Sequence, residues 1–342
     1  KVVLVGENVP KFDHDPITKQ SKGLLIEESR TNYQQYSVDM TQAPNSNEVT
    51  VENNAAIAPD GTMSASKITG GTNQSTSQRL GWSTQGVNSS THTQWSIWVK
   101  SEETSCIVQV YSNTYTIGAS YMNIELADGT TQGTTPGSTF RFNIKEYPNK
   151  WWRISWGGVG NAGGNSGGMY LAVVPTMNSG RAANTGSAHS KVWFAWGLQE
   201  EVSTTAQYST SYIPTYGSTA TRGVDNTLID GEEFSEFYNP IESTILVDYT
   251  HDFVTSSQLG VSTRVYRFQA VGGSDTRIDY VSNSGYNPYI AKDGSAVASI
   301  SHGQPTVFGG GVNRSAVRVK ENSFAVSFNG SAVSGNALDT SG

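Results

Sequence analysis

The residues best suited to chemistry near the start of the chain lie in KFDHDPITKQSKGLLIEESRTN, residues 11–32. Asp13, His14 and Asp15 are side chains that hard and borderline metal ions accept as ligands. In an extended segment, consecutive side chains point to alternate sides, so at most Asp13 and Asp15 are placed to share one ion. Asp commonly opens turns, and Pro16 fixes the next dihedral angle. The sequence therefore favours an Asx-type turn here over a metal site.

Adjacent acidic residues also occur as pairs along the chain. The pairs are Glu27/Glu28, Glu102/Glu103, Glu200/Glu201 and Glu232/Glu233. A glycosidase needs two carboxyl groups about 5 to 10 Å apart that face one cleft, whereas strand neighbours face opposite sides of a sheet. A pair assembled from distant strands stays open. No Gly-x-Ser-x-Gly elbow or local Cys/His signature indicates a nucleophile, so we expect no catalytic residues and no enzyme.

Other charged residues have structural interpretations. Arg30 with Glu27 or Glu28, and Arg222 with Asp225, are expected to form ion pairs at domain junctions. An exposed pair contributes only about 0 to 1 kcal/mol, so such pairs would fix orientation more than stability. We expect no cofactor and no metal site. A structural calcium ion, which takes carboxylate and carbonyl oxygens, remains possible at Asp60 or Glu201, although no spacing requires it.

Composition limits the classes of partner. The chain has 342 residues and a net charge of −7, without a Lys/Arg cluster, which argues against nucleic acid as a partner. No apolar run approaches the roughly 20 residues needed to span a bilayer, so no membrane insertion is expected. The single cysteine, Cys106, lies in the apolar run CIVQVY. We interpret Cys106 as a small buried hydrophobic residue and not as a reactive thiol.

The pattern of residues predicts an all-β protein of two tandem β-sandwiches. TQWSIWVK places Trp95, Ile97 and Val99 on one face of a strand, and similar alternating runs follow up to about residue 200. A polar stretch then precedes a second set of strands, and GEEFSEFYN is the one helix candidate. We expect an extended lead-in over residues 1–30, a first sandwich over 31–215 and a second over 216–342. Asn329-Gly330 predicts a tight hairpin turn in the second.

The faces opposite the predicted core offer the chemistry of sugar binding. Aromatic rings stack on the C–H face of a sugar, and Asn, Gln, Asp and Arg side chains hydrogen-bond its hydroxyls. The residues expected on these faces are Trp98, Gln109 or Tyr111, Asn123, Glu125, Arg141, Asn143 and Arg153. Trp82, in the turn-rich RLGWSTQG, is a further candidate. A polar exposed face covered by a loop or a subunit is the alternative interpretation.

Three stretches, in order and spacing, resemble bacteriophage tail-fibre, tailspike and other virion structural proteins with concanavalin A-like jelly-roll domains. They are FDHDPITKQSKGLLIEESRTNYQQYS, NNAAIAPDGTMSASKIT and VWFAWGLQEEVSTTAQYSTSYIPTYGSTATRGVDN. The resemblance implies a carbohydrate-binding-module-like first sandwich and a laminin-G-like second sandwich. The laminin-G-like half normally carries further strands after the point that corresponds to Gly342, so we expect this half to be truncated.

The resemblance also implies a function. It predicts a virion component that attaches, without catalysis, to a host-surface glycan or to other virion proteins, and a fibre of this kind is expected to be a homotrimer. Three alternatives stay open: a capsid or tail decoration protein that acts only through protein contacts, a tailspike polysaccharide depolymerase, and a secreted cellular carbohydrate-binding module. Jelly rolls host all of these roles, so the fold does not decide among them.

Overall fold

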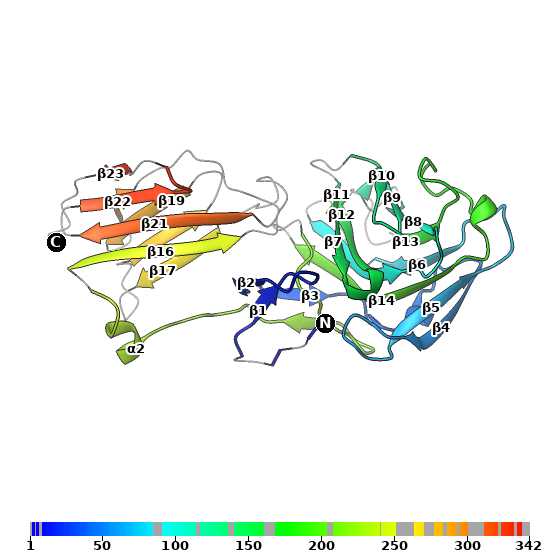
Figure 1. Ribbon diagram of the computed structural model, residues 1–342, viewed down its shortest axis with the longest axis horizontal. Coiled ribbons are helices and arrows are strands. Elements are labelled where there is room, and N and C mark those ends of the chain that lie inside the picture. The colour runs from blue at the N-terminus through cyan, green and yellow to red at the C-terminus, as the bar shows by residue number, and fades with distance from the viewer. Residues whose placement is uncertain are drawn as a thin grey trace. The chain divides into compact units, whose positions relative to one another are not determined.

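The computed structural model divides the chain into two compact units, Lys1–Asp225 and Asn226–Gly342, which are described separately (Figure 1). Nearly every element is an antiparallel β-strand, which confirms the predicted all-β fold. The structure describes all residues except 1, 4, 7–8, 85–90, 114–116, 136–139, 161–167, 204–207, 240, 251–262, 270–276, 283–285, 293–294, 300–310, 321–322, 332–333 and 337–342. Within residues 263–299 and 334–336 it describes the backbone of the strands only.

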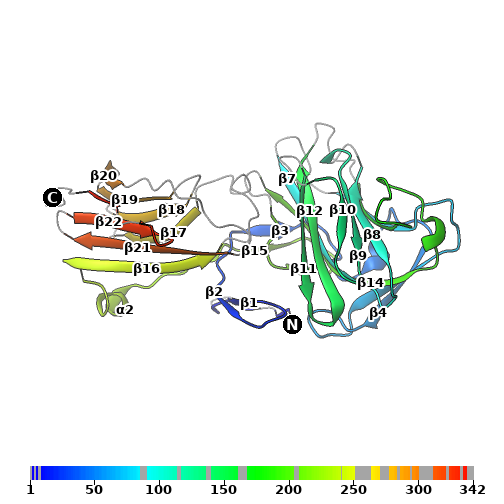
Figure 2. The ribbon, with the colours of Figure 1, turned by 45° about the horizontal axis from the view of Figure 1, so that its top comes forward.

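The first unit is a sandwich of two antiparallel sheets (Figure 2). The five-stranded sheet contains, in order, β10 (Thr131–Gly133), β9 (Tyr121–Glu125), β8 (Ile107–Ser112), β13 (Gly168–Val173) and β6 (Arg79–Ser83). The six-stranded sheet contains β11 (Arg141–Tyr147), β12 (Trp151–Val159), β7 (His92–Lys100), β14 (Val192–Ser203), β5 (Ala65–Gly70) and β4 (Val49–Ala56). Three short 3-10 helices lie in connections: η1 (Met40–Gln42), η2 (Pro148–Lys150) and η3 (Gly186–Ala188).

The core between the two sheets follows the alternation read from the sequence. Trp95, Ile97 and Val99 of β7 are fully buried and face side chains of the other sheet such as Val108 and Leu171. Cys106 belongs to the same core, and burial raises the pKa of its thiol to about 12. The cysteine is therefore a small buried hydrophobic residue, as predicted.

The outer face of the six-stranded sheet carries a second apolar cluster. Trp98, Trp151, Phe194 and Trp196 are buried there, on the opposite side of their strands from the main core. Tyr212, from the segment that follows β14, lies against this cluster, with its ring centroid 5.6 Å from that of Trp98. Both faces of this sheet are consequently buried over its central strands, so β7 is buried at all seven positions between its ends.

The lead-in belongs to the first unit, and the strand that follows it pairs with the last strand of that unit. β1 (Phe12–His14) pairs with β2 (Ser21–Leu24), and β3 (Arg30–Asn32) pairs with β15 (Ala220–Arg222) in a two-stranded ribbon. The first unit therefore extends ten residues beyond the boundary expected at residue 215, because β15 completes a ribbon whose other strand lies near its start. We call this ribbon and its flanking charged residues Lys11, Glu27 and Asp225 the junction.

The second unit contains two four-stranded antiparallel sheets. One has the order β16 (Glu242–Thr250), β21 (Val312–Lys320), β22 (Ser323–Phe328), β23 (Ser334–Asn336), and the other β17 (Thr263–Gln269), β18 (Arg277–Ser282), β19 (Tyr286–Lys292), β20 (Ser295–Ser299). The helix candidate is the single turn α2 (Gly231–Ser235). Asn329 and Gly330 both have positive φ values, 46° and 78°, as the predicted tight turn requires.

No helix in the described part of the chain is long and apolar enough to cross a membrane.

Candidate functional site

A row of three tyrosines crosses the outer face of the five-stranded sheet. Tyr170 of β13 is the register partner of Tyr111 of β8, which is the register partner of Tyr121 of β9. Their neighbours along each strand, such as Leu171 and Met122, point into the core, so the three tyrosines point outward. The rings of Tyr111 and Tyr170 stack, with centroids 4.9 Å apart and an interplanar angle of 25°. We call Tyr170, Tyr111 and Tyr121 the tyrosine row.

Two glycines leave room for the Tyr170 ring on the sheet surface. Gly81 of β6 is the register partner of Tyr170, and a Cβ atom added there would lie 2.8 Å from Tyr170 Cδ1 and 2.6 Å from the Asn45 carbonyl oxygen. A Cβ at Gly168 would also collide with the Tyr170 ring. The ring therefore lies close to the backbone, where any side chain at these two positions would displace it.

Two arginines flank the tyrosine row. The guanidinium carbon of Arg79 lies 4.9 Å from the ring centroid of Tyr170, and that of Arg181 lies 5.3 Å from that of Tyr111. Such distances allow cation–π attraction, which holds each cation against the aromatic surface. Arg181 also donates a hydrogen bond to the Ser112 carbonyl oxygen. The side chain of Arg79 makes no ion pair with a carboxylate among the described residues.

Exposure differs along the row. Tyr170, Tyr121, Arg79 and Arg181 are partly exposed, whereas Tyr111 is only 3% exposed. Burial raises the pKa of the Tyr111 hydroxyl, although the nearby charge of Arg79 acts against this rise. The phenol of Tyr111 is therefore neutral near pH 7 and keeps its proton for donation.

The next row of the same face is used by the protein itself. Gln109 donates to Asn123 Oδ1 at 2.7 Å, and Asn123 Nδ2 donates to the carbonyl oxygens of Met177 and Ser179 at 2.9 and 2.8 Å. Gln109 Oε1 accepts from the Ala182 backbone N–H at 2.6 Å. Asn123, expected as a sugar ligand, is 1% exposed and instead fixes the loop that carries Arg181, because its amide is consumed by that loop.

Glu125 of β9 shares this face, but its carboxylate accepts hydrogen bonds from the Ser105 hydroxyl and the Cys106 N–H. The remaining predicted sugar-binding residues do not join this face. Trp98, Arg141 and Arg153 lie on the outer face of the six-stranded sheet, on the other side of the sandwich. Trp98 is 1% exposed, and its ring is covered by the rings of Trp196, Tyr147 and Tyr212 at centroid distances of 5.3, 5.7 and 5.6 Å. The prediction of one exposed platform is therefore wrong, because two separate sheets supply its residues and later segments cover them.

Arg153, Arg141 and Trp82 are each buried or hydrogen-bonded within the first unit. Arg153 lies 4.6 Å from the Trp98 ring centroid and donates to Ser96 Oγ and the Thr210 carbonyl oxygen. Arg141 is 7% exposed at the start of β11. Trp82 is part of the main core, since its strand β6 places Leu80 and Trp82 on the inner face. None of the three presents its side chain as an open sugar-stacking surface.

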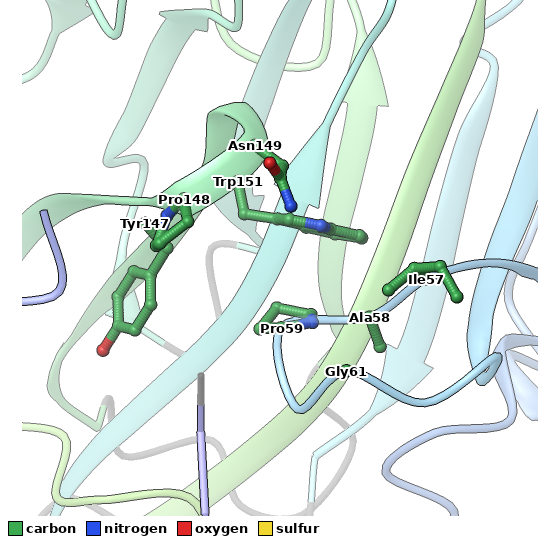
Figure 3. Close-up of a pocket in the computed structure, with 8 residues that line it drawn as sticks. All are labelled: Ile57, Ala58, Pro59, Gly61, Tyr147, Pro148, Asn149 and Trp151. Atoms are coloured by element: carbon green, nitrogen blue, oxygen red, sulfur yellow. The ribbon is translucent and has the colours of Figure 1, made fainter.

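A small pocket lies over the second apolar cluster (Figure 3). Its volume is about 210 Å³, and the connection from β4 to β5 faces the turn from β11 to β12 across it. The lining residues are Ile57, Ala58, Pro59, Gly61, Tyr147, Pro148, Asn149 and Trp151. The lining is mainly apolar, and Asn149 supplies its one side-chain amide, so the pocket lacks the several converging polar groups of a specific saccharide site.

The acidic candidates near the start and end of the first unit are engaged elsewhere. Asp15 accepts hydrogen bonds from the backbone N–H groups of Ile17 and Thr18 at 2.9 and 2.7 Å, which confirms the predicted turn and lowers the pKa of Asp15. Asp60 accepts from Thr62 in a similar turn. No group of three or more metal-ligating side chains occurs among the described residues.

The adjacent carboxylates of β14 point to opposite sides. Glu200 is the register partner of the core residue Trp95, and Glu201 binds Thr210 on the outer side, with the Thr210 N–H donating at 2.9 Å. Burial raises the pKa of Glu201. The two groups therefore do not face one cleft, as the strand geometry predicted.

Sequence reasoning missed Tyr170, Tyr121, Arg79 and Arg181. The strand GMYLAVV contained one signal, since burial of Met169, Leu171 and Val173 requires Tyr170 to point outward. The register that brings Tyr170 beside Tyr111 depends on pairing between distant strands. Local patterns do not specify that pairing.

Comparisons with known proteins identify no family. No family model and no curated protein matches the chain. Among solved structures, the CBM22-1 and GH10 modules of Clostridium thermocellum endo-1,4-β-D-xylanase 10B with xylohexaose share 8% identity over 54% of this chain and 30% of theirs, with a TM-score of 0.30. An arabinose-bound GH51 α-L-arabinofuranosidase shares 10% identity over 51% of this chain and 26% of its own, with a TM-score of 0.29.

A third structure, domains LG4-5 of the mouse laminin α1 chain, shares 12% identity over 90% of this chain and 83% of its own, with a TM-score of 0.22. The chain thus spans less than a third of the length of the first two structures. The function is therefore argued from the residues of this chain.

Proposed function

We propose that the chain is a non-catalytic attachment module that binds a surface polysaccharide through the outer face of its five-stranded sheet. The observation that carries this proposal is the tyrosine row with its two flanking arginines. Partly exposed rings of Tyr170 and Tyr121 offer stacking surface to the C–H faces of sugar rings, while guanidinium groups donate to hydroxyl and carboxyl oxygens.

The biological setting that we propose is a bacteriophage virion. Its support is the similarity of three sequence stretches to tail-fibre and tailspike proteins, which also suggests a homotrimer in contact with other virion proteins. Several tethered copies raise the effective concentration of a weak sugar site, so modest affinity per copy suffices for attachment. We propose no role for nucleic acid, since the net charge of the chain is −7.

Glycan binding by the full chain tests the proposal. Wild-type protein on an array of bacterial surface glycans is expected to bind, and Tyr170→Ala and Tyr121→Ala are each expected to weaken binding about tenfold or more. Loss of the aromatic partner of a stacked nucleic-acid base costs about 1 to 3 kcal/mol, and a loss of about 1.4 kcal/mol for a sugar corresponds to tenfold weaker binding. Release of free reducing sugar from the bound glycan would instead identify a depolymerase.

The matched control is Tyr216→Ala, which removes a tyrosine that is 76% exposed and lies outside the row. Tyr216→Ala is expected to bind like the wild type. Equal binding by Tyr170→Ala, Tyr121→Ala and the wild type would refute the tyrosine row as the site. No glycan binding by a correctly folded wild-type chain would favour a decoration protein that acts through protein contacts.

A further inference from the structure

We infer that the ligand of the tyrosine row is an acidic polysaccharide whose carboxylates bind Arg79 and Arg181. This inference rests on the proposed function and specifies its ligand class. Its starting point is that both guanidinium groups lie beside aromatic rings, 4.9 and 5.3 Å from the centroids, and form no ion pair among the described residues.

Three other arginines of the chain pair with carboxylates. Arg30 lies 2.7 Å from Glu28, Arg222 lies 3.3 Å from Glu27, and Arg314 binds Asp248 through two hydrogen bonds of 2.7 and 2.6 Å. The sequence has 29 acidic and 22 basic residues, so carboxylates are in excess. Two partly buried arginines without acidic partners in such a chain keep their charge available for an external anion.

A uronate ring fits this arrangement better than a neutral sugar. Its carboxylate is attached directly to the ring, so a sugar that lies along the tyrosine row extends the carboxylate from its edge toward a flanking guanidinium. A planar carboxylate accepts two parallel hydrogen bonds from one guanidinium, which makes the contact both strong and specific. Arginines at both ends of the stacked pair suit a polymer with a carboxylate on successive sugars.

The test compares acidic sugars with their carboxyl-reduced forms. Hexasaccharides of alginate, polygalacturonate and hyaluronate, and the reduced form of each, are titrated into the full wild-type chain by calorimetry at low salt. At least one acidic form is expected to bind about tenfold or more tightly than its reduced form. Rising salt should reduce this preference, because partly exposed charges are screened.

Arg79→Gln and Arg181→Gln separate charge from stacking. Each substitution is expected to weaken binding of the acidic form about tenfold and to weaken binding of the reduced form by a smaller factor, because a neutral hydroxyl gains less than a carboxylate from a guanidinium. The control is Arg318→Gln, an exposed arginine of β21 that bonds only Ser323 among the described residues and should bind like the wild type. Tryptophan fluorescence verifies that the first unit is folded in Arg79→Gln and Arg181→Gln, and circular dichroism verifies the fold of Arg318→Gln.

The outcomes distinguish the two proposals. Equal binding of acidic and reduced forms, or a preference for neutral or phosphate-bearing glycans on the array, overturns the acidic ligand and leaves the tyrosine row as a saccharide site. If the wild-type chain shows no preference for the acidic over the reduced sugars at any salt concentration, the acidic ligand is overturned, even where a variant fails to fold. Loss of glycan binding in Arg79→Gln but full binding in Tyr170→Ala would retain the arginines and refute the proposed stacking.

Discussion

At the residue scale, Glu27 shows how position in three dimensions decides which charges pair. Its side chain is 8% exposed and lies 3.3 Å from both Lys11 and Arg222, and it accepts the Ser211 N–H at 2.8 Å. Asp225 binds Lys11 at 2.5 Å. The expected pair between Arg222 and Asp225 is therefore wrong, whereas that between Arg30 and Glu28 is confirmed.

Burial alone would raise the pKa of Glu27, but Arg222, Ser211 and Lys11 together hold it below its usual value. A carboxyl whose pKa is lowered on folding stabilises the native state above its unfolded pKa, about 4.3. That contribution is lost as the pH falls through the lower folded pKa, because the native state then takes up the proton as well.

Glu27→Gln is expected to lower the free energy of unfolding of the first unit by about 2 kcal/mol at pH 7, since Lys11 and Arg222 lose a charged partner whose side chain is largely buried. The difference should shrink below about pH 4. Urea unfolding followed by tryptophan fluorescence measures it, because all eight tryptophans lie in the first unit.

The matched control is Glu102→Gln, whose side chain is 72% exposed and pairs only with Lys100 among the described residues. It should change stability by less than about 0.5 kcal/mol. An equal loss in both variants would show that the junction contributes no more than a surface pair.

At the element scale, a bulge in β14 sets which side chains enter each cluster. Between Trp196 and Gln199, two residues of β14 oppose one residue of β7. Gly197 occupies the bulge with a φ of +70°, and a Cβ atom there would lie 2.8 Å from the Trp98 ring. The bulge places Trp196 outward and Leu198 in the main core.

Gly197→Ala is expected to destabilise the first unit by about 1 to 3 kcal/mol, because the new methyl group combines a strained φ with overpacking against Trp98. The control is Gly180→Ala, where a Cβ atom meets nothing within 4 Å and φ is not in the left-handed region. Urea midpoints measure both variants. A stable Gly197→Ala protein would mean that β14 can pair without the bulge.

Sequence patterns predicted which side chains share one face of a strand, but not which other segments cover that face. The alternation in TQWSIWVK correctly separated Trp95, Ile97 and Val99 from Trp98. It did not indicate that Trp98 is buried, because the covering rings of Tyr147 and Tyr212 come from segments far along the chain. The tyrosine row was partly missed for the same reason, since only strand pairing aligns its members.

At the scale of the whole molecule, the end of the first unit is set by the ribbon of β3 and β15. The polar composition of this stretch did not indicate a strand. The polar stretch before the second set of strands contains β15, which pairs with β3 near the start of the chain. A fragment of residues 1–225 is therefore expected to unfold at the same urea midpoint as the full chain when tryptophan fluorescence is followed.

A fragment of residues 1–215 provides the comparison. It lacks β15, Arg222 and Asp225, so Glu27 keeps only Lys11 as a cation and β3 loses its partner strand. We expect a loss of about 3 kcal/mol relative to the longer fragment. Equal stability of the two fragments would place the end of the first unit at residue 215, as the sequence suggested.

The ribbon of β3 and β15 also determines how the first unit carries mechanical load. The chain enters the ribbon at Arg30 and leaves it at Arg222, and these two residues are register partners. Tension on the flanking segments therefore peels the strands apart from one end, one hydrogen bond after another. The contacts of Glu27 with Lys11 and Arg222, and of Lys11 with Asp225, lie at that end and break first. A pulling force is thus absorbed at the junction before it reaches any strand of the sandwich.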